Sequence, residues 1–271
     1  MSTTVGIGVG EVMARCRAEG RAALVGYLPV GYPDVPRSVE AMVTLVEAGV
    51  DIVEVGVPYS DPLMDGPLIA HAADVALKGG VRVHDVFTAT RAVRDAGAPP
   101  LVMTYWNLIL RHGPEAFARD LAAAGGAGLI TPDLIPDEAG PWIAASEATG
   151  LDRVFLVAPS STEERIAAVT SQCRGFVYAA SHMGVTGART SLGDAASVIV
   201  GRTRAATDLP VCVGLGVSDG AQAAEVAAYA DGVIVGSALV RCLVDAPDRA
   251  SGLAALRTLV GELAEGVRSG R

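Results

Sequence analysis

Two acidic residues, Glu54 and Asp65, have the types and spacing that suit proton transfer. Glu54 interrupts a short apolar run over residues 51–57, and Asp65 follows it in the segment YSDPLMDGP. An ionisable group in the middle of a buried strand costs free energy unless the site needs it. If the run is a strand, Glu54 points away from its apolar neighbours, and Asp65 lies on the loop that follows. Two carboxylates at one end of a parallel sheet suit proton transfer in both directions.

The same two residues also have a plainer interpretation. Glu54 is then a solvated residue of an edge strand, and Asp65 is a turn residue. The local sequence leaves both interpretations open, so the choice depends on the elements that position the two side chains.

Eight short apolar runs have the pattern of buried strands, and Ala-rich stretches with helical periodicity separate them. Strands that are apolar throughout and alternate with helices indicate a parallel sheet with helices outside it. The runs cover residues 22–28, 51–57, 101–105, 128–131, 153–157, 175–180, 211–214 and 232–235. The intervening helical stretches include 39–48, 83–95, 114–124, 162–171 and 221–228.

Eight such units in 271 residues predict a single (β/α)8 barrel domain over residues 1–271, with a doubly wound sheet as the alternative. The connections after the second and sixth strands are longer than the others, and long connections in a compact domain are usually functional. We expect both loops at the barrel face where active sites are built. A further helix near residues 11–19 is predicted to cover the barrel floor.

Three glycine-rich stretches follow the last three predicted strands: GVTG at 184–187, GLGVS at 214–218 and GSA at 236–238. Backbone N–H groups at such turns bind anions, and the loops after strands 7 and 8 are the usual phosphate position in these barrels. The three stretches together favour a phosphorylated ligand. Ser237 adds its hydroxyl to that site or caps the helix that it opens.

Composition excludes several classes of function. The net charge of −9 argues against a general nucleic-acid binder. Lys78 is the only lysine, and it ends a predicted helix, so the chain has no good candidate for a Schiff base or for anchoring pyridoxal phosphate. The four histidines share no metal-ligand spacing, which argues against a zinc site.

The cysteines and the N-terminal segment bear on the compartment. Four widely spaced cysteines in apolar or helical surroundings are expected to be buried free thiols, which fits a reducing cytoplasm. The N-terminal segment lacks the pattern of a signal peptide, and no apolar run is long enough to span a membrane. We therefore expect a cytoplasmic protein.

Tyrosines near the predicted strand ends are further candidates. Tyr178, in the sixth strand, is either a core residue or a hydroxyl of the site. Tyr105 ends the third strand and packs against an apolar ligand or against the barrel mouth. Tyr27, in the first strand, is assigned to the core.

Five segments closely resemble the tryptophan synthase alpha chain family. The first is VEVGVPYSDPLMDGP at 53–67, and the others are PDLIPDE, MGVTGAR, VGLGVS and VGSALV. The likeness covers essentially the whole chain in order, and the pair of motifs SDP-x-x-DGP and GVTG is highly specific. The resemblance implies a (β/α)8 lyase that cleaves indole-3-glycerol phosphate to indole and glyceraldehyde 3-phosphate.

The resemblance also implies roles for individual residues. Glu54 matches the acid/base catalyst, and Asp65 matches the aspartate that stabilises the indole N–H. Tyr178, Tyr105 and Thr186 are expected to bind the substrate, with Thr186 on a loop that closes over it. The positions that match the phosphate site are Gly187, Gly216, Gly236 and Ser237.

The family likewise implies a partner. Indole passes to a beta chain, which carries pyridoxal phosphate and makes tryptophan from indole and serine, in an alpha2beta2 assembly. This chain itself needs no cofactor and no metal. The beta chain is expected to dock on the 58–67 loop and the 105–112 segment.

The sequence departs from many family members at Tyr32 and at His182, where aspartate and arginine are common. Two rival functions remain at this stage. One is another phosphate-binding barrel, such as a phosphosugar isomerase or epimerase, although its usual metal-binding histidines or lysine are absent at the strand ends. The other is a barrel that only regulates a partner, and the retention of both acids argues against it.

Overall fold

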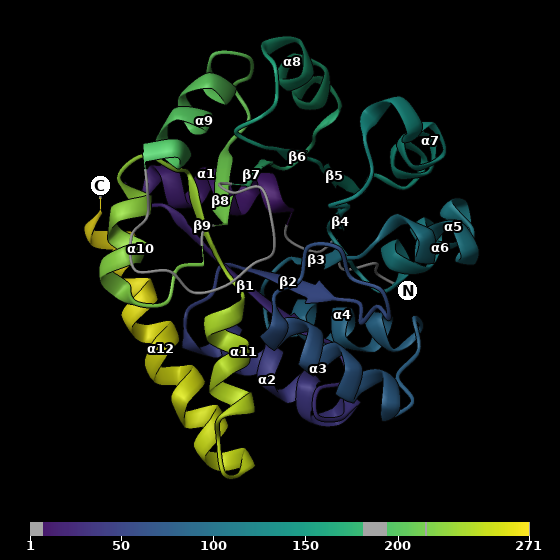
Figure 1. Cartoon of the computed structure of the whole chain (residues 1–271), viewed down its shortest axis with the longest axis vertical. Helices are drawn as coiled ribbons and strands as arrows, with labels where there is room; N and C mark the ends of the chain where they lie inside the picture. Colours follow the sequence, from purple (N-terminus) through teal and green to yellow (C-terminus); the bar gives the residue numbers. More distant parts are fainter. Residues whose placement is uncertain (1–7, 181–193, 215, 271) are drawn as a thin grey trace.

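The computed structural model describes residues 8–180, 194–214 and 216–270, which form a parallel barrel enclosed by helices (Figure 1). In these residues nine strands are hydrogen-bonded in the order β5-β4-β3-β2-β1-β9-β8-β7-β6. The strands are β1 Ala23–Pro29, β2 Ile52–Gly56, β3 Pro100–Met103, β4 Gly128–Ile130, β5 Asp152–Val154, β6 Leu156–Val157, β7 Val177–Ala180, β8 Val211–Gly214 and β9 Gly232–Val235.

The two ends of this sheet meet within one stretch of chain, residues 152–157. β5 pairs with β4, and β6 pairs with β7. Phe155 lies between them, and its carbonyl accepts the N–H of Tyr178 at 3.2 Å. Val154 and Leu156 pack in the barrel interior while Phe155 packs outside, so the alternation of side chains continues through the break. The prediction of an eight-stranded barrel is confirmed, with the fifth strand divided between two neighbours.

Helices surround the barrel on its outer side (Figure 1). They are α1 Val9–Ala18, α2 Val35–Ala48, α3 Pro67–Lys78, α4 Asp85–Asp95, α5 Trp106–His112, α6 Pro114–Ala123, α7 Gly140–Thr149, α8 Glu163–Gln172, α9 Asp194–Arg204, α10 Gly220–Ala227, α11 Ser237–Val244 and α12 Arg249–Ser269, with a short 3-10 helix at Pro136–Glu138. The five helices named from periodicity are confirmed as α2, α4, α6, α8 and α10. Several begin where a side chain accepts an N–H of the first turn, as Asp34, Thr162, Asp219 and Asp248 do.

The long connection after β2 has a structural explanation. It contains the irregular segment 57–66 and then two helices, α3 and α4, in place of one. The predicted extension after β2 is therefore confirmed. Most of the extended segment after β7 lies in 181–193, outside the described residues.

Most strand positions are buried on both faces, as the continuous apolar runs predict, although alternate residues of β7 are only partly buried. β2 and β9 are buried at every position. The outward residues pack against the helices in one large cluster, and the inward residues form a second cluster inside the barrel. The inward residues include Ala23, Val25, Ile52, Leu101, Ile130, Val154, Phe176, Cys212 and Ile234.

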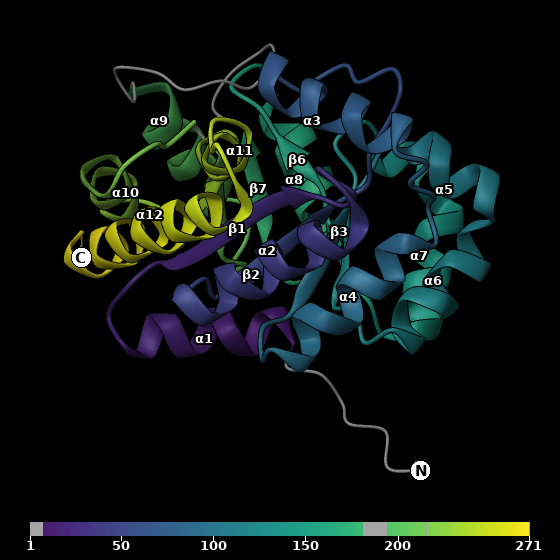
Figure 2. The ribbon, with the colours of Figure 1, turned by 90° about the horizontal axis from the view of Figure 1, so that it is seen from below.

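Helix α1 closes one end of this interior. Val9, Val12, Met13 and Cys16 belong to the same cluster as the inward strand residues. Figure 2 shows α1 along the lower end of the barrel and α3 at the upper end. The predicted floor helix is thus confirmed, two residues earlier than expected at its start, and the opposite end of the barrel is its mouth.

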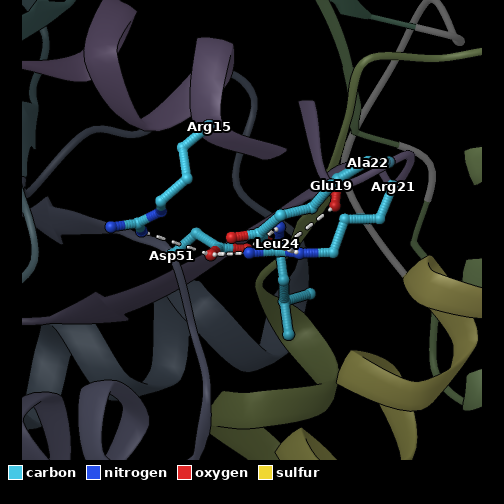
Figure 3. A network of polar contacts seen from close by, with 6 residues as sticks. All are labelled: Arg15, Glu19, Arg21, Ala22, Leu24 and Asp51. Carbon is cyan, nitrogen blue, oxygen red and sulfur yellow. Dashed lines mark hydrogen bonds and ion pairs between the residues drawn. The ribbon is translucent and has the colours of Figure 1, made fainter. Parts of the chain in front are cut away.

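A network of charged groups fastens the floor (Figure 3). Arg21 binds the carboxylate of Asp51 with two hydrogen bonds of 2.7 and 2.8 Å, and Asp51 also accepts the N–H of Leu24 at 2.9 Å. Glu19 binds Arg21 from the end of α1 at 2.7 Å, and Arg15 lies 3.9 Å from Asp51. The network joins α1, β1 and the start of β2.

The four cysteines are free. Cys16, Cys173 and Cys212 are buried as expected, whereas Cys242 is partly exposed, because it lies on the side of α11 that faces a surface cavity. Among the described helices, none is both long enough and apolar enough to cross a membrane.

Candidate active site

Glu54 lies inside the barrel, in the layer above the apolar floor. Its backbone is in register with Tyr27 of β1 and Leu101 of β3, and its side chain is 1% exposed. It occupies the inward face two residues after Ile52, which belongs to the interior cluster. The interpretation as a solvated edge residue is therefore wrong, because β2 lies between β1 and β3.

The carboxyl group of Glu54 is buried without a full set of hydrogen bonds. Its Oε1 atom has no hydrogen-bond partner among the described residues. Burial raises the pKa of Glu54 to about 8, because the charged form loses its hydration and gains no neighbouring cation. At neutral pH the group therefore holds a proton that it can give up and take back, as a general acid and base must.

Asp65 lies on the 57–66 segment, and Tyr105 holds that segment in place. The hydroxyl of Tyr105 accepts the backbone N–H groups of Leu63 and Met64 at 3.2 and 3.0 Å, and it donates to Oδ1 of Asp65 at 3.5 Å. Burial raises the pKa of Asp65, and the hydrogen bond from Tyr105 acts in the opposite direction. The two acids thus have different surroundings, since, within the described residues, only Asp65 of the two accepts a hydrogen bond that opposes the effect of burial.

Tyr27 stands with the two acids. Burial raises the pKa of Tyr27 well above its usual value, and the nearby charges of Asp65 and Glu54 raise it further. The two acids therefore lie near one phenol. The Tyr27 ring lies against Gly56, where an added Cβ would come 2.5 Å from the Tyr27 hydroxyl oxygen.

Tyr27 packs against the core, as assigned, and its ring also lies near the mouth of the barrel. Tyr27 alternates along β1 with Ala23 and Val25, which belong to the interior cluster, and this alternation was the signal that could have found it.

Tyr178 reaches the same region from β7. Burial raises the pKa of Tyr178 well above its usual value, and the nearby charge of Glu54 raises it further. Its hydroxyl oxygen would lie 2.3 Å from a Cβ placed on Gly214, so a glycine there gives the phenol its space. Tyr178 also packs against the interior cluster, so core packing and a position near Glu54 hold together for this residue.

The glycine turns after β8 and β9 lie at the same end of the barrel. Gly216 has φ +71°, a conformation that glycine adopts without strain. Gly236 precedes α11 and has no side chain to cap the helix, while Ser237 is its first residue and is 8% exposed. N–H groups at such a helix start are available to an anion. Thr186, Gly187 and His182 lie outside the described residues.

Other candidates are placed away from this site. Lys78 is 76% exposed at the end of α3 and pairs with Asp74 at 2.6 Å, as a solvated helix-end lysine should. Within the residues that the structure describes, no group of three histidine, cysteine or acidic side chains could hold a metal ion. Tyr32 packs its ring edge against His71, with centroids 6.4 Å apart.

Comparisons with known proteins agree with this geometry. The family model described as "Tryptophan synthase alpha chain" matches residues 13–268. The chain is 64% identical to the tryptophan synthase alpha chain of Mycobacterium tuberculosis (strain H37Rv) over 262 residues, which cover 97% of this chain and 95% of the relative. It is also 64% identical to that of Mycobacteroides abscessus over 258 residues, covering 95% and 96% of the two chains.

Solved structures give the same result. A chain of Mycobacterium tuberculosis tryptophan synthase superposes with a TM-score of 0.91 at 65% identity, covering 96% of this chain and 98% of that one. The tryptophan synthase alpha chain of Legionella pneumophila superposes with a TM-score of 0.85 at 29% identity, covering 96% of each chain. A barrel with two unlike carboxyl groups at its mouth and this likeness over nearly its whole length belongs to the tryptophan synthase alpha chain family.

Proposed function

We propose that Glu54 is the acid and base of the reaction that this chain catalyses. The chain is a carbon–carbon lyase of tryptophan biosynthesis, which cleaves indole-3-glycerol phosphate to indole and glyceraldehyde 3-phosphate. The observation that supports the assignment is the buried Glu54 carboxyl, with its unpaired Oε1 and a pKa of about 8.

The cleavage needs two proton transfers, and Glu54 can perform both in turn. Its protonated form first delivers a proton to ring carbon C3 of the indole. The resulting carboxylate then removes the proton of the hydroxyl next to the bond that breaks. The electron pair of that O–H bond forms the aldehyde carbonyl, and the electron pair of the C–C bond returns to the ring. Glu54 ends protonated, ready for the next turnover.

Asp65 is assigned to the indole nitrogen. Protonation at C3 leaves positive charge on that nitrogen, and a carboxylate placed in advance stabilises it. Burial raises the pKa of Asp65, and the hydrogen bond from the Tyr105 hydroxyl opposes that rise by stabilising the carboxylate, which supports this role. Tyr178 and Tyr105 are assigned to substrate binding beside the two acids, and Thr186 is assigned to the same role as a proposal from family likeness.

The phosphate group of the substrate is assigned to Gly187, Gly216, Gly236 and Ser237. The uncapped start of α11 and the left-handed Gly216 support the last three. Backbone dipoles would hold the anion locally, which suits a chain whose net charge of −9 repels it.

The partner assigned to this chain is a tryptophan synthase beta chain in an alpha2beta2 assembly. Three large apolar side chains of the chain described here are exposed, on segments that follow the neighbouring strands β2, β3 and β4. They are Leu63 at 76%, Leu110 at 58% and Ile135 at 44%. Exposed apolar groups at one end of a protein often mark a docking surface. These side chains support docking of the beta chain on the 58–67 loop and the 105–112 segment, and they add Ile135 to the proposed docking surface.

The cofactor is assigned to the partner, and the complex to the cytoplasm. The acid and base chemistry above needs no prosthetic group on this chain, and pyridoxal phosphate belongs to the beta chain in this proposal. The exposed and paired Lys78 supports that division, because pyridoxal phosphate requires a lysine at the active site. Buried free thiols support a reducing compartment.

The test follows glyceraldehyde 3-phosphate release from indole-3-glycerol phosphate by the purified chain, with and without a beta chain. We expect slow turnover alone and a strong rise with the partner, because loop ordering limits the isolated chain. Turnover that the beta chain leaves unchanged would argue against the assembly. No turnover in either case would remove the proposed catalytic roles.

A further inference from the structure

The position of Asp65 depends on contacts from outside its own segment. Residues 57–66 form neither helix nor strand between β2 and α3. Tyr105, the residue that precedes α5, contacts three consecutive residues of the segment through a single hydroxyl oxygen, at Leu63, Met64 and Asp65. A shift of that oxygen would therefore move Asp65 and the backbone before it together.

The contact to Asp65 itself is the longest of the three, at 3.5 Å, whereas an O–H···O bond is normally about 2.7–2.8 Å. A hydrogen bond at this limit weakens steeply when the donor moves away. The strength of the bond is thus sensitive to small displacements of the Tyr105 ring.

Tyr59 packs against that ring. The two ring centroids are 4.9 Å apart, and the ring planes are tilted by 32°. Tyr59 belongs to the same segment as Asp65, so the ring of Tyr105 is held between its own helix and the segment that it supports.

Asn107 in turn fixes Tyr59. Its side-chain Nδ2 donates to the hydroxyl oxygen of Tyr59 at 3.3 Å. Asn107 is the second residue of α5, two positions after Tyr105. The contacts thus form a closed circuit from α5 through Asn107 and Tyr59 to Tyr105, and from Tyr105 to Asp65.

We propose that Tyr59, anchored by Asn107, is a positioning residue that sets the Tyr105–Asp65 contact for the cleavage reaction. The proposal rests on the assignment of Asp65 to the indole nitrogen. Tyr59 touches no reacting atom in this role. It places Asp65 where the positive charge develops, so it affects the transition state more than the binding of the phosphate.

Two single variants and their combination test the circuit. Tyr59→Phe keeps the ring and removes its hydroxyl, and Asn107→Ala removes the donor from the exposed surface of α5. Each is expected to lower kcat by about tenfold, since displacement of a group by less than 1 Å is costly in a positioned site. The KM for indole-3-glycerol phosphate should change by less than about twofold, because uniform binding is untouched.

The double variant is the sharper readout. Because both changes break one hydrogen bond, the double variant should lose no more kcat than either single variant. Tyr229→Phe is the matched control, because it likewise removes only a tyrosine hydroxyl. Tyr229 is half-buried just before β9, at the floor end of the barrel, so the variant should keep wild-type kcat and KM. Urea unfolding of all variants checks that the fold is retained.

Asp65→Asn, measured in the same assay, separates the proposed role of Asp65 from the proposed positioning role of Tyr59. If Asp65→Asn loses turnover while Tyr59→Phe and Asn107→Ala keep wild-type kcat, the positioning role is wrong and the role of Asp65 stands. Losses that multiply in the double variant would also overturn the circuit. Wild-type turnover by Asp65→Asn would overturn both proposals.

Discussion

Two acids of the β2 region are in opposite conditions. Asp51 lies just before the strand at the floor, and Glu54 lies in the strand three residues later, in the layer below the mouth. Asp51 accepts two hydrogen bonds from Arg21 and one from a backbone N–H. Glu54 is more deeply buried, and one of its oxygens is left without a partner.

The difference matches the proposed roles, in which this barrel uses one buried acid for structure and the other for chemistry. A carboxylate whose oxygens accept hydrogen bonds from a guanidinium and a backbone N–H holds elements together. A carboxyl with no compensating cation costs stability, but its proton becomes available near neutral pH. In barrels of this kind the floor serves stability and the mouth serves catalysis.

The largest expected effect is on catalysis by Glu54→Gln. The amide cannot exchange a proton with the substrate, so kcat should fall by about 10³-fold, within the range typical of lost acid and base catalysis. The free energy of unfolding should stay equal or rise, because no ionisable group remains buried there. Glyceraldehyde 3-phosphate release and urea unfolding measure the two quantities. Substantial turnover would remove Glu54 from its role.

The reverse pattern is expected for Asp51→Asn. This change leaves the guanidinium of Arg21, 12% exposed, without its buried anion. Only the half-exposed Glu19 then remains as an ionic partner among the described residues, so the free energy of unfolding should fall by about 3 kcal/mol. The kcat should stay near wild type, because the floor lies away from the reacting groups.

Asp74→Asn is the control for that prediction. It breaks the exposed pair with Lys78 and should cost less than about 1 kcal/mol in urea unfolding. Equal losses for the two variants would contradict the distinction between a buried and an exposed pair.

The pH dependence of stability sharpens the contrast further. The folded protein keeps the Glu54 proton up to about pH 8, whereas the unfolded chain releases it near pH 4.5. Between those values the folded state binds more protons, so the contribution of Glu54 to stability is present at low pH and is lost as pH rises. The free energy of unfolding of the wild type, minus that of Glu54→Gln, should fall by about 1.4 kcal/mol per pH unit across this window.

The same pKa should govern activity. In the proposed mechanism the first step needs protonated Glu54, so kcat/KM should decline above about pH 8. A decline of kcat/KM that begins near pH 5 would show that Glu54 is ionised in the free enzyme. That result would contradict the raised pKa expected from its burial.

The smallest effect is expected for Tyr178→Phe. The change removes a hydroxyl near Glu54 but keeps the ring over Gly214. We expect kcat to fall by about two- to fivefold, the size of one lost neutral hydrogen bond. A loss as large as that of Glu54→Gln would mean that the phenol itself exchanges the proton.

Much of the fold could be predicted from the sequence because its signals are local. The apolar runs and the helical periodicity located the strands and the five helices named in advance. The division at Phe155 could not be predicted, because it reflects which neighbour each half of the segment pairs with, and pairing is a property of the closed sheet.

The candidate site was only partly accessible to the same reasoning. Glu54 was conspicuous because an acid stands in an apolar run. Tyr27 was not, since a tyrosine in a buried strand is ordinary, and only the barrel brings its ring to Gly56 and near both acids. The support of Asp65 by Tyr105, forty residues along the chain, likewise depends on the packing of separate segments.

The sequence by itself determined the alternation of elements, the likeness to a family and the identity of the two acids, because these depend on residue type and spacing along the chain. The tertiary structure decided that Asp51 is paired and Glu54 is not, although only three positions separate them. The reason is physical: a pKa depends on the water, charges and donors around a group, and folding alone brings those neighbours into place.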